Sequence, residues 1–276
     1  RNSCFEKTIS DSIELILISA LETLLWRWNC IVEKYSTVMG INFPRITLDQ
    51  TVQILSNVIE QNSSQLFQVI TVNPEITMAC LKDKLLRSIV DEAGLITADG
   101  IGIVMVSRLR GDSLPERVTG YDALLKLLDT GNQKKWSFYF LGADPITNQK
   151  VCEVIGEKYP DLVLLGRHHG FFKQHEEDQI VNEIAFLKPD ILVVALGAPY
   201  AEKWIHKNRT KLNAKIAIGV GGSLDVISGK VKPTPDKWKR LNLEWLFRLI
   251  QQPSRWKRQL ILPRFLIRAL LYRESK

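Results

Sequence analysis

Five short apolar runs, separated by stretches with helical periodicity, constrain the fold of this 276-residue chain more than any other feature of its sequence. The runs are predicted to be strands, at 66–71, 136–142, 161–166, 190–197 and 215–220. Helices are predicted at 47–61, 74–90, 120–130, 145–158, 174–187 and 200–211. Strands that alternate with helices form parallel sheets covered on both faces. The sequence therefore predicts the α/β class, with a mostly parallel, Rossmann-like sheet and helices on both of its faces.

Basic residues are concentrated at the C-terminal end of the chain. From Lys230 onward the sequence has 13 Lys or Arg and three acidic residues, a net charge of +10, whereas the preceding 229 residues carry −3. Between 243 and 273, Leu, Phe and Trp alternate with Arg and Lys, a pattern of short amphipathic helices separated at Pro253 and Pro263. We therefore predict three regions: a helical extension at 1–35, an α/β domain at 36–232 and a C-terminal amphipathic helical appendage at 233–276. The appendage is expected to bind a polyanion, either a nucleic acid or an anionic membrane.

Several kinds of site are not supported by the sequence. The four cysteines show no C-x-x-C spacing, which disfavours zinc and redox sites and fits idle thiols in a reducing cytosol. His168, His169 and His175 have no further residue at metal-ligand spacing. No G-x-G-x-x-G or Walker motif occurs, no secretory signal is recognisable, and charges interrupt the apolar helix predicted in the first 35 residues. A metal, a dinucleotide cofactor and a transmembrane segment are therefore not expected.

Polar residues that follow the predicted strands are the first candidates for chemistry, because ligands of open α/β sheets bind beyond the carboxyl ends of the strands. Thr71 and Asn73 follow the first strand, although Asn73 before Pro74 could simply cap the next helix. Asp99 lies between apolar runs and just before two closely spaced glycines. A carboxylate there could accept a proton from a hydroxyl nucleophile. An aspartate that only forms a turn is the alternative.

Two further clusters suit an anionic ligand. Arg117 could clamp a phosphate or carboxylate with its planar guanidinium, although an ordinary surface arginine is the alternative. Gly221 and Gly222 follow the last predicted strand, and Asp225 comes three residues later. Bare backbone N–H groups in such a loop suit a phosphate or a ribose, and a tight structural turn is the alternative.

Taken in order, these clusters resemble the WecG/TagA/CpsF family of bacterial glycosyltransferases. The matching segments are 71–75, 99–104, 117–122, 140–143, 196–199 with 202–204, 219–232 and 243–249. They extend from about residue 38 to about residue 258, some four-fifths of the chain. The run from Gly219 to Ser223, followed by Asp225 and by 227–230, is very specific.

The resemblance implies a UDP-sugar-dependent hexosyltransferase with a direct, inverting mechanism, no cofactor and no metal requirement. Such an enzyme moves N-acetylmannosamine or a related hexose to an undecaprenyl-diphosphate-linked acceptor in cell-surface polysaccharide or teichoic-acid-type synthesis. It is expected to be cytoplasmic and peripheral on the inner face of the plasma membrane. Its expected partners are a UDP-sugar donor, a polyprenyl-diphosphate-linked acceptor and an anionic membrane surface. Whether the chain also forms a homo-oligomer is left open.

The resemblance also assigns roles by motif position. Asp99 takes the place of the general base, and Thr71 that of its catalytic neighbour. Contacts with substrate are implied for Asn73, Arg117, Asp225 and Arg248, the last of which is expected to reach the diphosphate. Gly221 and Gly222 are expected to bind substrate through their backbone N–H groups. Membrane contacts are expected from Arg255, Arg258, Arg264, Arg268 and Arg273.

The chain departs from the family pattern beside the predicted nucleotide site. Tyr200 and Ala201 stand where the family usually has a glutamine before Glu-Lys-Trp, and Phe171-Phe172 stands where Tyr-Phe is common. Two alternatives to an active transferase stay open. One is a catalytically silent relative that binds a nucleotide sugar. The other is a nucleic-acid-binding protein that uses its basic tail, which would explain the charge but not the acid and glycines at the strand ends.

Overall fold

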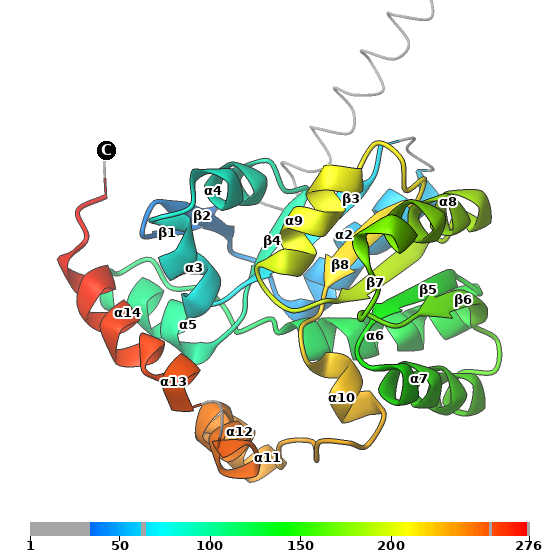
Figure 1. Cartoon of the computed structure of the whole chain (residues 1–276). Coiled ribbons are helices and arrows are strands. Elements are labelled where there is room, and N and C mark those ends of the chain that lie inside the picture. The colour runs from blue at the N-terminus through cyan, green and yellow to red at the C-terminus, as the bar shows by residue number, and fades with distance from the viewer. Residues whose placement is uncertain (1–33, 62–64, 254–255, 275–276) are drawn as a thin grey trace, which may run out of the picture.

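The protein is described by a computed structural model over residues 34–61, 65–253 and 256–274. Its centre is a six-stranded parallel sheet in the order β4-β3-β8-β7-β5-β6 (Figure 1). The strands are β3 (Phe67–Val72), β4 (Leu95–Ala98), β5 (Ser137–Gly142), β6 (Val163–His168), β7 (Ile191–Ala195) and β8 (Ile216–Gly219). The predicted α/β class is confirmed. The predicted extension at 1–35 lies almost wholly outside the described residues.

The helices cover both faces of the sheet, as the sequence predicts. One face is covered by α2 (Leu48–Glu60), α6 (Gly120–Lys134) and α7 (Pro145–Lys158). The other face is covered by α3 (Pro74–Cys80), α4 (Lys84–Asp91), α5 (Ile101–Leu109), α8 (Glu177–Leu187) and α9 (Tyr200–Asn208), with the 3₁₀ turn η1 (Gln174–Glu176) before α8. Successive residues of a strand point to opposite faces, so the buried runs supply both cores at once. Neighbouring side chains of β8 illustrate this: Ile218 packs in the core under α2, α6 and α7, and Ala217 packs in the core under α8 and α9.

Capping residues set several helix boundaries. Thr47 and Gln50 form a capping box at the start of α2. The single helix predicted at 74–90 is instead two helices, and that prediction is wrong. The chain breaks because the Asp83 carboxylate accepts the Leu86 N–H at 3.0 Å and so begins α4 afresh.

Three strands were not predicted. β4 is only four residues long and is followed closely by the apolar helix α5, so the sequence shows no alternation of apolar and polar residues that would mark it as a strand. β1 (Tyr35–Val38) and β2 (Ile41–Pro44) form an antiparallel hairpin outside the main sheet. Its turn residues Met39 and Gly40 have φ values of 52° and 77°, the left-handed pair that a tight two-residue hairpin turn requires.

The C-terminal appendage consists of short helices, as predicted. After α10 (Ser223–Ile227) come α11 (Asp236–Arg240), α12 (Glu244–Gln251), α13 (Trp256–Gln259) and α14 (Ile261–Leu271). Pro263 does not separate two helices, because it is the third residue of α14, where a missing N–H does not remove a helical hydrogen bond. None of the helices in the described ranges combines the length and apolarity needed to cross a bilayer.

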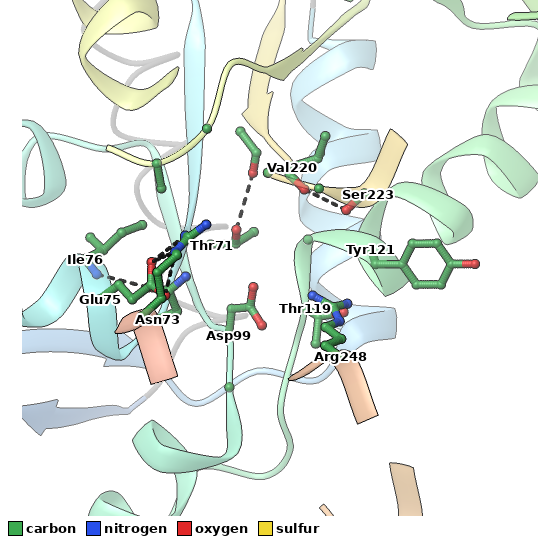
Figure 2. Close-up of a pocket in the computed structure, with 18 of the residues that line it drawn as sticks. Thr71, Asn73, Glu75, Ile76, Asp99, Thr119, Tyr121, Val220, Ser223 and Arg248 are labelled. Carbon is green, nitrogen blue, oxygen red and sulfur yellow. Dashed lines mark hydrogen bonds and ion pairs between the residues drawn. The ribbon is translucent and has the colours of Figure 1, made fainter. Parts of the chain in front are cut away.

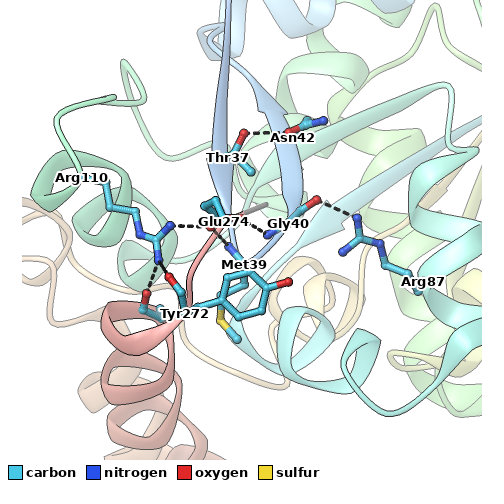
Figure 3. Close-up of polar contacts among 9 residues, drawn as sticks. Thr37, Met39, Gly40, Asn42, Arg87, Arg110, Tyr272 and Glu274 are labelled. Atoms are coloured by element: carbon cyan, nitrogen blue, oxygen red, sulfur yellow. Dashed lines mark hydrogen bonds and ion pairs between the residues drawn. The ribbon is translucent and has the colours of Figure 1, made fainter. Parts of the chain in front are cut away.

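The appendage returns to the body at its far end. α14 packs on α3 and α5, and Phe265 and Ala269 are fully buried in the core that contains the hairpin. Figure 3 shows the polar clasp beside it, in which the Glu274 carboxylate accepts the N–H groups of Met39 and Gly40 at 2.8 and 2.7 Å. Arg110 pairs with Glu274 and donates to the Tyr272 carbonyl at 2.7 Å. The appendage is therefore held at both ends.

Candidate active site

A cavity of about 500 Å³ lies at the carboxyl ends of the strands, between the sheet and the appendage. All eight residues predicted to act on or bind substrate line it: Thr71, Asn73, Asp99, Arg117, Gly221, Gly222, Asp225 and Arg248. We call the part built by Thr71, Asp99, Glu202 and the loop 219–222 the strand-end wall. The part built by Glu244, Arg248 and Arg258 is the appendage wall. Residues that lie up to 187 positions apart thus meet in one space.

The cavity forms where neighbouring strands send the chain to opposite faces of the sheet. β3 and β8 are hydrogen-bonded neighbours, but β3 leads into α3 on one face and β8 leads into α10 on the other. Such a point leaves an open crevice at the strand ends. The Thr71 hydroxyl spans the two strands and donates to the Gly219 carbonyl at 3.3 Å.

Asn73 performs the helix-capping role that was the alternative to ligand binding. Its side-chain oxygen accepts the Ile76 N–H at 2.9 Å at the start of α3. Asn73 also lines the cavity, and the cap occupies only the oxygen. The amide NH₂ group is therefore the part of Asn73 with which it can contact a ligand.

Asp99 is placed by the end of the sheet. Its N–H donates to the Val72 carbonyl at 2.9 Å, which continues the pairing of β4 with β3. Figure 2 shows its carboxylate in the space between the 71–75 segment and Arg248. Burial raises the pKa of Asp99 to about 6, while Arg248 and Arg117 act in the opposite direction. Near neutral pH this carboxylate is ionised and is a stronger base than an ordinary aspartate.

A carboxylate joins the two predicted cationic residues. Glu244, the first residue of α12, lies 2.6 Å from Arg117 Nη1 and 3.2 Å from Arg248 Nη2. The Arg117 side chain is only 18% exposed, so it is not the ordinary surface arginine of the alternative interpretation. The bridge fixes both guanidinium groups close enough to Asp99 to influence its pKa.

The loop after β8 is shaped for close approach of a ligand. Gly221 has a φ of 52°, which favours glycine, and a side chain on Gly219 would lie 2.9 Å from Glu202 Oε1. The Ser223 hydroxyl donates back to the Val220 carbonyl at 2.6 Å, so the turn is also internally bonded. The tight-turn interpretation of these glycines is therefore confirmed, and ligand binding by the same loop stays a prediction.

The predicted membrane arginines do not form one group. Arg258 lies at the edge of the cavity, where its guanidinium pairs with Glu75 of α3 at 2.5 Å. Arg264, Arg268 and Arg273 are exposed on and just after α14. Arg255 lies outside the described residues.

Three acidic residues of the cavity received no role from the sequence. Glu75 pairs with Arg258, Glu244 pairs with both Arg248 and Arg117, and Glu202 is a buried carboxyl. A usable signal existed for Glu202, because it stands one turn before the buried Ile205 on the apolar side of a predicted helix. Ala201, where the family usually has glutamine, is itself buried at 1% exposure in α9.

The described residues contain no group of three or more His, Cys, Asp or Glu side chains arranged to hold a metal ion. His168 ends β6 and His169 follows it, and their ring centroids lie 4.6 Å apart with the ring planes tilted by 49°.

Comparison with known proteins identifies the family. The model of the glycosyl transferase WecG/TagA/CpsF family matches residues 36–276. A Bacillus subtilis protein named N-acetylglucosaminyldiphosphoundecaprenol N-acetyl-β-D-mannosaminyltransferase is 39% identical over 206 residues, 75% of this chain and 80% of the relative. Proteins of the same name from Bacillus spizizenii and Staphylococcus aureus are 37% identical over 207 residues and 28% over 221 residues, covering 75% and 80% of this chain and 80% and 85% of the relatives. The cavity residues and these matches together establish that the chain is a glycosyltransferase of the WecG/TagA/CpsF family.

Proposed function

We propose that this protein transfers N-acetylmannosamine, or a related hexose, from a UDP-sugar to N-acetylglucosaminyl-diphospho-undecaprenol. The acceptor and the transferred sugar are those in the name of its relatives. The observation that carries the proposal is the position of Asp99, a carboxylate with a raised pKa in a cavity that Arg117 and Arg248 also line. A base next to two cations is what glycosyl transfer from a nucleoside diphosphate requires.

The proposed reaction is a single displacement at the anomeric carbon of the donor. Asp99 accepts the proton of the acceptor hydroxyl while the hydroxyl oxygen forms a bond to that carbon. The bond from the carbon to the diphosphate oxygen breaks, and UDP leaves with the electron pair. Because attack and departure occur on opposite sides, the configuration inverts. Thr71, fixed to Gly219, would position the sugar beside Asp99.

The negative charge that develops on the diphosphate would be offset by the appendage wall. Arg248 and Arg258 come from the appendage, Arg117 comes from the body, and all three line the cavity. Asn73, Asp225 and the N–H groups of Gly221 and Gly222 would bind the rest of the nucleotide. With this many cations available, we expect transfer to proceed without a metal ion.

The exposed surface of α14 would bring the protein to its lipid-linked acceptor. Arg264, Ile267, Arg268 and Leu271 recur at helical spacing on one face, and each is exposed. Trp256 and Leu260, in and just after α13, are also exposed, at 54% and 45%. An apolar face edged with arginine is typical of helices that lie in the interface of anionic membranes. We therefore propose peripheral binding to the inner face of the plasma membrane.

A donor screen with purified protein and a short-chain lipid-diphosphate acceptor tests the proposal. We expect transfer from UDP-N-acetylmannosamine and release of one UDP for each product. Binding of UDP-sugars without any transfer would favour the silent relative instead. Binding to oligonucleotides but not to anionic liposomes at the same salt concentration would favour the nucleic-acid interpretation.

A further inference from the structure

Glu202 is a carboxyl group of the strand-end wall for which the proposed mechanism has no use. It lies in the first turn of α9, lines the cavity and is only 3% exposed. Its Oε1 atom lies where a side chain on Gly219 would have to go, at the carboxyl end of β8. Gly219 in turn accepts the Thr71 hydroxyl bond, so Glu202 is adjacent to a predicted catalytic position.

One oxygen of the Glu202 carboxyl has no hydrogen-bond partner in the part of the chain that the structure describes. This oxygen, Oε2, is completely buried, and the Gln68 amide bonds instead to the Glu202 backbone carbonyl. Leaving a buried polar group unpaired destabilises a fold, and such groups in native proteins call for an explanation.

Charged neighbours do not supply that partner. On α9, Lys203 pairs with Asp83 of α4, and Lys207 pairs with Glu177 of α8. After α9, Arg209 pairs with Glu92, and on α4 itself Arg87 pairs with Asp91. The strands β3 and β8 that pack against α9 carry no charged residue.

Without a cation nearby, burial dominates the protonation of Glu202. It raises the pKa of this carboxyl to about 7, and no charged side chain is among the causes of the shift. At neutral pH a large fraction of Glu202 is therefore the neutral acid, which has an O–H group to donate. Asp99 differs, because two arginines keep its pKa lower than burial alone would.

We infer that Glu202 is a ligand-binding residue that, as a neutral acid, donates a hydrogen bond to an uncharged oxygen, a hydroxyl or amide carbonyl, of the nucleotide-sugar donor. The inference rests on the proposed function for the identity of the donor. Phosphate oxygens are expected on the arginine side of the cavity, so the sugar or the nucleoside falls beside Glu202. Rotation about the last side-chain bond, which is broad and two-fold for glutamate, exchanges the two oxygens and presents the O–H to the cavity.

Calorimetric titration of the full chain with UDP-N-acetylmannosamine and with UDP at pH 6.5 and 8.5 tests this inference. The affinity of the parent for the UDP-sugar should fall roughly 3- to 10-fold at the higher pH, because Glu202 ionises and loses its donor. Glu202→Ala should be weak at both pH values. Glu202→Gln, whose amide still donates, should recover most of that affinity and remove the pH dependence. Glu177→Gln, a buried carboxylate outside the cavity, is the matched control and should behave like the parent.

The two ligands locate the contact. If only the UDP-sugar responds to pH, the hydrogen bond is to the sugar, and if UDP responds equally, it is to the nucleoside. The inference is overturned if Glu202→Gln keeps the pH dependence of the parent, or if it binds as weakly as Glu202→Ala. A transfer assay on the parent separates the two proposals. If there is no transfer but binding depends on pH through Glu202, only the proposed function is contradicted. If there is transfer but the Glu202 variants bind the donor as the parent does, only this inference is contradicted.

Discussion

The two walls of the cavity are built by different interactions. The strand-end wall is fixed by the backbone hydrogen bonds of a parallel sheet, and its carboxyls Asp99 and Glu202 have raised pKa values because they are buried. The appendage wall is held by side chains, namely the Glu244 bridge, the Arg258–Glu75 pair and the buried Phe265. We therefore propose a division of work in which the sheet places the proton-transfer group and the appendage supplies positive charge.

The largest expected effect concerns the strand-end wall. Asp99→Asn should lower kcat by ~10²–10⁴-fold, because an amide of nearly the same shape cannot accept the proton of the acceptor hydroxyl. Donor affinity, measured by calorimetry, should remain close to that of the parent. Turnover within a few-fold of the parent would remove Asp99 from the role of general base.

The exposed face of α14 should matter only where a membrane is present. Reversing the charge of Arg264, Arg268 and Arg273 should weaken binding to anionic liposomes by more than roughly 100-fold, since each basic residue near such a surface contributes roughly 1 kcal/mol and the acidic replacements add repulsion. Turnover on a soluble acceptor should be unchanged. Reversal of Lys126, Lys134 and Lys150, exposed residues of α6 and α7, is the control and should not affect liposome binding.

The inner side of the same appendage should show the opposite behaviour. Arg248→Ala should reduce kcat/KM on a soluble acceptor about 10- to 100-fold, the loss typical of a hydrogen bond to a charged group. Liposome binding should persist, because one charge of many is removed. If this variant and the triple reversal give the same pattern in both assays, the appendage has a single role and the comparison of its two sides fails.

The raised pKa of Asp99 predicts the acidic limb of the pH–rate profile. Burial favours the protonated form of this residue, so activity should rise as the pH rises through about 6. At pH 5 kcat/KM should be roughly tenfold below its plateau. The Glu202→Gln variant should keep this limb. A profile that is flat down to pH 5 would indicate a base with an ordinary carboxylate pKa.

The smallest expected effect is that of a chelator. If the arginines near the diphosphate offset its charge, EDTA should leave the rate of the parent unchanged. Inhibition by EDTA that magnesium or manganese reverses would assign part of that work to a metal ion.

The sequence predicted the strand-end wall better than the appendage wall. Buried strands and capping residues have local signatures, so the positions of Thr71, Asn73 and the 219–222 loop followed from the rule that ligands bind at strand ends. Arg248 was placed in the site only by the family resemblance. Nothing local predicts the docking of α14, which depends on Phe265 and on the Arg110–Glu274 pair, whose residues are 164 positions apart.

Two kinds of feature escaped prediction for physical reasons. β4 is too short, and too close to an apolar helix, to show a period of its own. Arg258 carries the same sequence signal as Arg264, but only its tertiary partner Glu75 distinguishes an arginine at the cavity from one on the outer surface. Periodicity identifies which face of a helix is apolar, and it does not identify what that face meets.

The clasp at Glu274 has a consequence for ligand affinity. Because the appendage is joined covalently to the body after α10 and non-covalently at the β1–β2 turn, it is a loop closed at both ends. Most of the chain entropy of bringing Arg248 and Arg258 to the cavity is thus lost before a donor arrives. Both guanidinium groups are present at a high effective concentration, as in a bivalent ligand whose second contact is intramolecular. Opening the clasp would therefore lower the effective concentration of Arg248 and Arg258 at the cavity, and with it the affinity for an anionic ligand, although no residue that lines the cavity would have changed.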